Sequence, residues 1–324
     1  MKFIRYFLIL IFVILNNSCY HAFYLFYDLK PSGVNEDVYL WRYGPFRENN
    51  ILAVLPENST FKINADLPVV DGATALYPLY ASFIQAVYPE DKYSYYSPRG
   101  NVVLASGTRD AYRHLIDRRV DMIFCSKPSD EQLEMANQKG ITLQLTPIGK
   151  EAFVFFVNRR NRVSNLTIDQ IRGIYSGNIT NWKELGGNNR GIKIYQRPRN
   201  SGSQTMLESI MGEYKIIEPL TEYVADGMGG HIRIALHRNY NTAIGYSFLF
   251  FATQMVQDNN LKLLSIDGVL PSRETIMNGN YPFAGDFYVI TADSNNENIN
   301  IFIEWILSEQ GQYLVEKTGY IPIK

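Results

Sequence analysis

An α/β fold with a parallel or mixed sheet is predicted by two features of this sequence. From residue 64 onward, short apolar segments typical of strands alternate with longer segments typical of helices, which is the pattern of a sheet covered by helices. Residues 152–157, Ala-Phe-Val-Phe-Phe-Val, form an unbroken apolar run that suits a strand buried on both faces. The chain of 324 residues, 46% of them hydrophobic, is large enough for a soluble globular protein with two lobes.

The first half of the alternating region contains three pairs of a strand and a helix. The second helix shows the pattern clearly, because Ala111, Leu115 and Ile116 recur at helical spacing. The predicted pairs are residues 69–70 with 77–88, residues 93–96 with 109–119, and residues 122–125 with 130–139.

The second half begins with the apolar strand at 152–157 and continues the alternation. A helix is expected from Thr167 to Tyr175, because Thr167 suits its first turn and Asp169 and Gln170 follow closely. The remaining predicted elements are a strand at 192–195, a helix from 205, strands at 243–246, 261–266 and 287–290, and a closing pair of helices over 298–317.

Glycine and small hydroxyl residues precede three of these helices. Residues 199–205, Arg-Asn-Ser-Gly-Ser-Gln-Thr, place a guanidinium, a glycine and several hydroxyls at one helix start, and residues 71–74 and 106–108 are similar. Backbone N–H groups at a helix start lack intrahelical partners and carry partial positive charge, so they favour an anion. Ordinary N-capping explains each segment alone. Three helix starts directed at one point would supply the convergent donors that a buried anion needs.

A targeting segment is predicted at residues 1–19. Two basic residues near the start are followed by an apolar run over 7–15, which is too short for a transmembrane span but suits the core of a signal peptide. Cys19 stands where the lipid-modified cysteine of a bacterial lipoprotein would stand; ordinary cleavage and retention as an uncleaved anchor are the alternatives. Residues 20–63 would form a tether and N-terminal extension. We therefore expect an exported protein of the bacterial cell envelope, lipid-anchored to the outer face of the cytoplasmic membrane or in the periplasm.

Composition and motifs argue against nucleic-acid binding and against several kinds of enzyme. The formal net charge is −1, and the sequence has no basic stripe. The four histidines lack metal-ligand spacing, and neither a G-x-S-x-G elbow nor a Walker loop occurs. A hydrolase that uses Ser203 would need a base, which only residues distant in the sequence could supply. We expect no metal, cofactor or catalytic residue, and we expect Cys125 to be a buried thiol.

Five segments, taken in order, match the motifs of one protein family. They are the glycine-containing loop and helix start at 71–80, the strand Val-Asp-Met-Ile-Phe-Cys-Ser at 120–126, Ile-Tyr-Ser-Gly-Asn-Ile-Thr-Asn-Trp at 174–182, Gly-Ser-Gln-Thr at 202–205 with Arg199 before it, and 311–322, which runs from Gly-Gln to Gly-Tyr-Ile-Pro. Together they resemble the phosphate-type solute-binding proteins of bacterial ABC importers. The resemblance extends from about residue 64 to residue 324.

This resemblance implies a two-lobed fold of the periplasmic-binding-protein type 2, with a ligand cleft between lobes that close around the ligand. Lobe I would combine residues 64–150 with 247–324, lobe II would comprise 151–246, and two crossing strands would join them. The implied function is capture of inorganic phosphate or a similar oxyanion outside the cytoplasm and its delivery to an ABC permease. A sensor or adhesion module on the same fold, and a phosphate-ester hydrolase, are the alternatives.

The resemblance also carries a set of ligand-binding residues onto the three helix starts. They are Thr74, Ala75, Ser106, Thr108, Arg199, Ser203, Gln204 and Thr205. Two departures bear on specificity: Lys127 follows Ser126 where relatives often have an acidic acceptor for the proton of phosphate, and Ser201 stands where an acidic residue is also common. A lysine can only donate a hydrogen bond. Asp71 or Asp110 could supply the acceptor instead, so the sequence supports an oxyanion more firmly than phosphate in particular.

Overall fold

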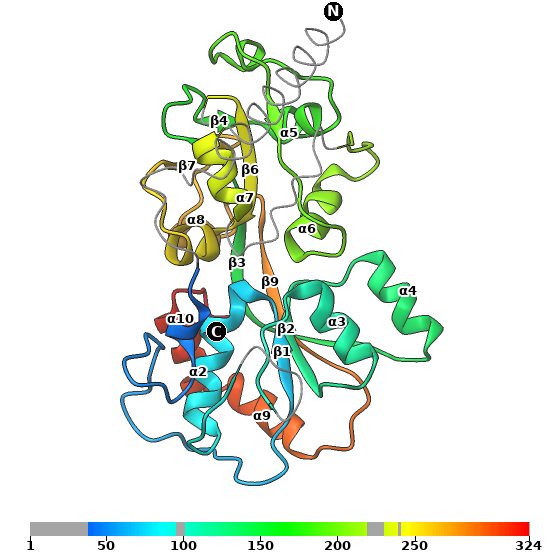
Figure 1. Cartoon of the computed structure of the whole chain (residues 1–324), viewed down its shortest axis with the longest axis vertical. Helices are drawn as coiled ribbons and strands as arrows, with labels where there is room; N and C mark the ends of the chain where they lie inside the picture. The colour runs from blue at the N-terminus through cyan, green and yellow to red at the C-terminus, as the bar shows by residue number, and fades with distance from the viewer. Residues whose placement is uncertain (1–37, 95–100, 219–229, 239–240, 324) are drawn as a thin grey trace, which may run out of the picture. The chain divides into compact units, whose positions relative to one another are not determined.

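The computed structural model describes residues 38–94, 101–218, 230–238 and 241–323 (Figure 1). The chain divides into Met1–Glu36 and Asp37–Lys324, and the fold described below is that of the second unit. The predicted signal segment with Cys19, residues 20–37 of the predicted tether and the end of the predicted strand at 93–96 lie outside the described residues. Within the described ranges, no helix combines the length and the apolar character needed to cross a membrane.

A mixed sheet runs through this unit, as the alternating pattern predicts. The strands follow the order β1-β2-β9-β3-β6-β5, and β7 also pairs with β3. The pairs β1–β2 and β5–β6 are parallel, and the other pairings described in this sheet are antiparallel. The strand bounds are β1 Val70–Gly72, β2 Met122–Cys125, β3 Gln144–Asn158, β5 Lys193–Ile194, β6 Ala243–Phe248, β7 Leu261–Leu263 and β9 Ala284–Thr291. A second sheet pairs β4 (Asn165–Leu166) with β8 (Ser265–Ile266).

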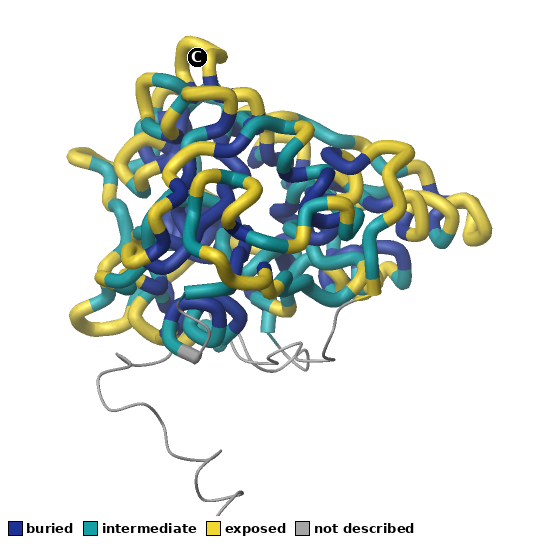
Figure 2. Tube along the Cα trace, turned by 90° about the horizontal axis from the view of Figure 1, so that it is seen from above, coloured by how far each residue is buried: buried dark blue, intermediate teal, exposed yellow. Residues whose placement is uncertain are grey.

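Strand β3 joins two hydrophobic cores. Its residues 144–152 pair with β9, and its residues 153–158 pair with β6 and β7. The first core contains side chains of β1, α2 and α10, and the second contains side chains of α5, β6 and most of the run at 152–157. Every residue of that run is buried, which confirms the predicted strand. Figure 2 shows the buried residues gathered in the interior of the unit and the exposed residues on its outer turns.

Most of the helices cover one core or the other, and α5 begins at the cap that the sequence predicts. Thr167 Oγ1 accepts a hydrogen bond from the Gln170 N–H at 3.1 Å, and the Thr167 N–H donates to Gln170 Oε1 at 2.9 Å. These two bonds fix the start of α5. The helix bounds are α2 Tyr77–Val87, α3 Thr108–Ile116, α4 Asp130–Gln138, α5 Ile168–Tyr175, α6 Gly202–Met211, α7 Gly230–Arg233, α8 Arg273–Met277, α9 Asn298–Ile306 and α10 Glu309–Thr318. In Figure 1, α2, α3, α4, α9 and α10 surround one end of the sheet, and α5, α6, α7 and α8 surround the other.

The division of the chain between lobes stays a prediction, but the packing differs from it in two stretches. Residues 264–283, assigned to lobe I with the rest of 247–324, supply Leu264, Ile276 and Tyr281 to the second core. These residues pack with the second core because the neighbouring strand β7 pairs with β3 and because β8 pairs with β4. Residues 232–236, assigned to lobe II, pack instead into the first core.

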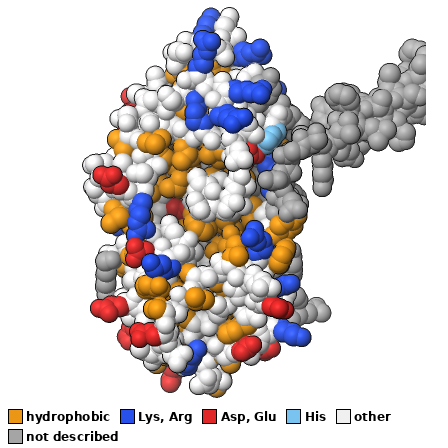
Figure 3. Space-filling model, turned by 90° about the vertical axis from the view of Figure 1, so that its left-hand side faces the viewer, with side chains coloured by type: hydrophobic (Ala, Val, Ile, Leu, Met, Phe, Trp, Pro, Cys, Tyr) orange, Lys and Arg blue, Asp and Glu red, His pale blue; other side chains and the backbone are white. Residues whose placement is uncertain are grey.

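Charged side chains are unevenly distributed on the face shown in Figure 3. Lysine and arginine predominate toward the end of the molecule that contains the second core, most of the visible aspartate and glutamate lie toward the opposite end together with further basic side chains, and apolar side chains lie between the two ends.

Candidate anion-binding site

The starts of α3 and α6 meet at Gly202, and the loop before α2 lies beside them. A β-carbon placed on Gly202 would lie 2.7 Å from Ser126 Oγ and 3.1 Å from Thr108 Oγ1. A β-carbon placed on Gly107 would lie 3.9 Å from Thr74 Oγ1. Gly202 is the first residue of α6, and Thr108 is the first residue of α3. Thr74 begins the short 3-10 helix Thr74–Leu76 that leads into α2. The three segments singled out in the sequence are therefore neighbours in space.

The first two segments are held together by backbone hydrogen bonds at the ends of β1 and β2. The Ala73 N–H donates to the carbonyl of Phe124 at 2.9 Å, and the Gly107 N–H donates to the carbonyl of Gly72 at 3.0 Å. Gly107 has a φ of +83° directly before α3, a conformation that favours glycine. This turn places Thr108 at the first position of the helix.

The third segment begins α6 with a cap of its own. The Ser201 side chain accepts a hydrogen bond from the Gln204 N–H at 3.3 Å, and Asn200 before it has a φ of +64°. The Gln204 side chain is buried and accepts hydrogen bonds from the Arg197 N–H and the Tyr246 hydroxyl. The side chain of Gln204 is thus occupied within the protein, and its N–H caps α6, so the expected contact of its backbone with a ligand stays a prediction.

Two hydroxyl groups beside this meeting point have no partner among the described residues. Ser126 Oγ and Thr205 Oγ1 are both buried and make no hydrogen bond there. A buried hydroxyl without a partner costs about 1–3 kcal/mol, so such atoms indicate a place for a polar ligand or water. Both residues line a pocket of about 1000 Å³, together with Ala75 and Gly202. Ser126 is a candidate ligand residue that the sequence analysis did not select.

The structure separates the two arginines of the third segment. Arg199 is exposed, and no hydrogen bond or ion pair described here joins it to the other predicted residues. Arg197 is half-buried, and its Nη1 donates to Nδ1 of His231 at 3.2 Å. Burial, and then the charge of Arg197, hold the pKa of His231 well below its ordinary value, so a neutral imidazole accepts this bond. The guanidinium of Arg197 is therefore held at His231 of α7, while its backbone N–H donates to the Gln204 side chain of α6.

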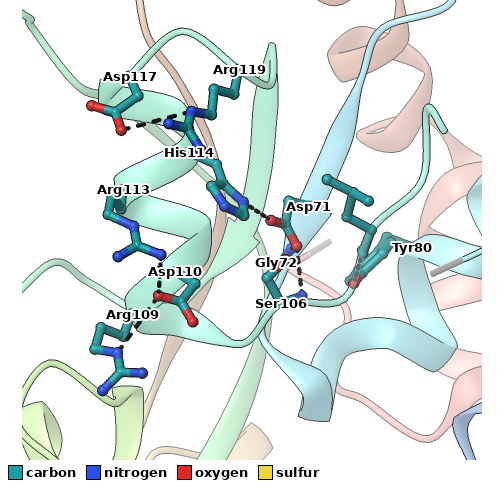
Figure 4. A network of polar contacts seen from close by, with 11 residues as sticks. Asp71, Gly72, Tyr80, Ser106, Arg109, Asp110, Arg113, His114, Asp117 and Arg119 are labelled. Atoms are coloured by element: carbon teal, nitrogen blue, oxygen red, sulfur yellow. Dashed lines mark hydrogen bonds and ion pairs between the residues drawn. The ribbon is translucent and has the colours of Figure 1, made fainter. Parts of the chain in front are cut away.

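The acidic groups considered in the sequence analysis have protein partners. Asp71 is fully buried and accepts hydrogen bonds from two backbone N–H groups. Asp110 lies 3.0 Å from Nη2 of Arg113 and 3.6 Å from Nε of Arg109 (Figure 4). Lys127 is exposed and lines the pocket. Neither aspartate is therefore left unpaired as an acceptor for the proton of a ligand.

Other carboxylates line the pocket, and one of them is strongly perturbed. They are Asp130, Glu151, Glu208 and Asp286. Burial raises the pKa of Glu151 to about 8, against the opposing effect of a hydrogen bond from the Phe250 N–H at 2.7 Å. A protonated Glu151 therefore lies in the wall of the pocket at neutral pH.

Two further expectations concern cysteine and metal. Cys125 is buried, as predicted, and burial raises the pKa of its thiol far above the ordinary value. Within the described ranges, no three or more His, Cys, Asp or Glu residues are grouped so that they could hold a metal ion.

Comparison with known proteins places these features in a family context. The model of a family described as the PBP superfamily domain matches residues 65–310. The phosphate-binding protein PstS of Bacillus subtilis is 25% identical over 265 residues, 78% of this chain and 80% of that protein. PstS of Borreliella burgdorferi is 26% identical over 188 residues, 55% of this chain and 66% of that protein.

Solved structures show the same fold at low sequence identity. A substrate-binding protein of Clostridium perfringens, solved with bound phosphate, aligns with a TM-score of 0.62 at 23% identity and covers 81% of this chain and 100% of its own. An ABC-type phosphate transport receptor of Vibrio cholerae aligns with a TM-score of 0.58 at 23% identity and covers 80% of this chain and 99% of its own. The two-lobed α/β fold expected from the resemblance is thereby confirmed.

Proposed function

Because this chain belongs to the PBP superfamily, we propose that it captures inorganic phosphate, or a similar oxyanion, between its two lobes and delivers it to an ABC permease. The observation that carries the proposal is the meeting of helix starts at Gly202 beside the unpartnered hydroxyls of Ser126 and Thr205. Such an arrangement offers hydrogen-bond donors where an oxyanion needs them. The names of the PstS relatives, which are phosphate-binding proteins, support the choice of ligand.

The proposed ligand shell consists of neutral donors and one guanidinium. The hydroxyl groups are those of Thr74, Ser106, Thr108, Ser126, Ser203 and Thr205. The backbone N–H groups are those of Ala75 and Gln204, and the Gln204 N–H would share its proton between the ligand and Ser201 Oγ. Arg197 is our first choice for the guanidinium, because it is half-buried and its backbone N–H bonds the Gln204 side chain of α6, and the exposed Arg199 is the second. A guanidinium matches the geometry of a tetrahedral oxyanion through paired N–H donors.

Calorimetric titration of the purified chain with phosphate, and then with sulfate, tests the function. We expect phosphate to bind at both pH 6 and pH 8. Strong binding of phosphate without binding of sulfate would support a phosphate receptor with an acceptor elsewhere in the pocket. Binding of both anions would mean a broader oxyanion receptor, because Lys127 and Ser201 replace acidic residues that favour a protonated ligand. Binding of neither would contradict the proposal.

Replacement of each arginine separates the two candidates for the charged donor. We expect Arg197→Ala to weaken phosphate binding by about 2 kcal/mol, near thirtyfold, the scale of a lost charge-assisted hydrogen bond. Arg199→Ala should change the affinity less than about threefold, because an exposed guanidinium is largely solvated. The dissociation constants of both variants, measured by calorimetry, decide the matter. A larger loss in Arg199→Ala would restore Arg199 as the ligand residue.

Lipid anchoring through Cys19 is the remaining part of the proposal, and Cys19 lies outside the described residues. We expect Cys19→Ala to move the protein from the membrane fraction to the soluble fraction, because one thioether-linked lipid is lost while the rest of the chain is unchanged. Immunoblotting of fractionated cells measures this shift. A variant that stays with the membrane would show that the apolar segment at 7–15 is itself the anchor.

A further inference from the structure

Asp71 lies at the junction of the first and second helix starts. Its side chain is fully buried in the middle of β1. Oδ1 accepts hydrogen bonds from the Gly72 N–H at 2.7 Å and from the Ser106 N–H at 2.8 Å. One oxygen atom thus bonds the last residue of β1, which leads into the loop before α2, and also bonds the loop before α3 (Figure 4).

The other carboxylate oxygen is braced by α3. Oδ2 of Asp71 lies 2.8 Å from Nδ1 of His114, whose side chain is 12% exposed. His114 belongs to α3, the helix that the second loop begins. Because both oxygens have partners, the carboxylate cannot turn about its terminal torsion without breaking a hydrogen bond. Asp71 therefore fixes both loops and the helix behind one of them.

These bonds decide which groups the second loop can offer to a ligand. The N–H of Ser106 donates to Asp71, and the N–H of Gly107 donates to the carbonyl of Gly72. Both N–H groups are used within the protein and face the first loop. What the loop offers is then the exposed Ser106 side chain and Thr108 at the first turn of α3.

We propose that Asp71 is a positioning residue, which sets the first and second loops in the arrangement that binds the oxyanion. The proposal rests on the proposed function for its effect on affinity. Asp71 itself does not contact the ligand: it acts through Ser106 and Gly72. A carboxylate is suited to this task because a single oxygen has two lone pairs and accepts two N–H donors at once.

The matched control for Asp71 is Asp121, a second carboxylate that bonds the same region of the sheet. Asp121 Oδ2 accepts from the Val69 N–H at 2.8 Å, and Oδ1 accepts from the Ser294 hydroxyl at 3.0 Å. Val69 directly precedes β1, at the end of the strand away from the first loop. Asp121→Ala therefore removes a comparable bond to the sheet without touching the loops.

The experiment compares the full chain with its Asp71→Ala, Asp71→Asn, His114→Ala and Asp121→Ala variants. We expect Asp71→Ala to weaken phosphate binding at least tenfold, His114→Ala three- to tenfold, and Asp121→Ala less than twofold. Asp71→Asn should stay within about threefold of the wild type, because its amide oxygen can accept both N–H groups and its amide nitrogen can donate to a neutral imidazole. The amide of Ser106 should exchange with deuterium faster in Asp71→Ala and remain protected in Asp71→Asn and Asp121→Ala.

Several results would overturn the positioning role. One is an Asp71→Ala variant that binds phosphate as well as Asp121→Ala does. Another is an Asp71→Asn variant as weak as Asp71→Ala, since the hydrogen bonds would then not explain the loss. If Asp71→Ala fails to fold, His114→Ala carries the test, and wild-type affinity in that variant would overturn the role. If the wild-type chain binds no phosphate, the proposed function fails by itself, and the exchange rate of the Ser106 amide still decides whether Asp71 holds the loops.

Discussion

Gly202→Val is expected to weaken phosphate binding at least a hundredfold, which corresponds to about 2.7 kcal/mol. The reason is the close approach of the helix starts at this residue. The first added carbon would lie 2.7 Å from Ser126 Oγ and 3.1 Å from Thr108 Oγ1, and valine adds two methyl groups beyond it. Both crowded atoms are ends of side chains that can rotate, so the fold should survive while the donors are turned away. Calorimetric titration with phosphate measures the loss, and the thermal midpoint checks the fold.

Gly285→Val is the matched control for this substitution. Gly285 lines the same pocket, on β9, but a β-carbon placed there meets no atom within 4 Å. Valine is also well suited to a strand. We expect its phosphate affinity to stay within about threefold of the wild type. Equal losses of phosphate affinity in the two variants would mean that any added bulk in the pocket weakens binding. Wild-type affinity in Gly202→Val would show that phosphate does not bind where the helix starts meet.

The elements and helix starts were accessible from the sequence because the signals are local. A buried strand such as 152–157 and a cap such as Thr167 are specified by residues close together in the chain. The same is true of the glycine and hydroxyl residues before α3 and α6. Their meeting in space came from the resemblance to a known family, because no local pattern states which distant segments are neighbours.

The details of the site depended on contacts that the sequence does not encode locally. Two arginines flank Pro198, and only the folded chain shows that Arg197 is half-buried while Arg199 is exposed. The packing of residues 264–283 with the second core follows from pairing between β4 and β8, about a hundred residues apart. Asp71 was considered as an acceptor for the ligand, and only the positions of Ser106 and His114 show that its oxygens are already occupied.

Glu151→Gln is expected to stabilise the protein at neutral and mildly alkaline pH. Burial raises the pKa of Glu151 from 4.5 to about 8 in the folded chain. Between these values the folded state keeps a proton that the unfolded state has lost, so stability falls as pH rises, by up to about 1.4 kcal/mol per pH unit. The contribution of the protonated Glu151 to the stability of the folded state is fully present below about pH 4.5 and is lost as the pH rises through 8. Glutamine cannot ionise, so the Glu151→Gln variant should not lose stability in this way as the pH rises.

The expected gain in the free energy of unfolding is on the order of 4 kcal/mol near pH 8, and it should nearly vanish near pH 4.5. The amide oxygen of glutamine can still accept the bond from the Phe250 N–H that Glu151 accepts at 2.7 Å, so native packing is retained. Urea unfolding at several pH values measures the difference. Glu304→Gln, an exposed carboxylate on α9, should show no such dependence on pH. An equal gain at pH 8 and at pH 4.5 would contradict the raised pKa of Glu151 as the cause. The gain would then come from packing and not from the proton that Glu151 holds beside the pocket.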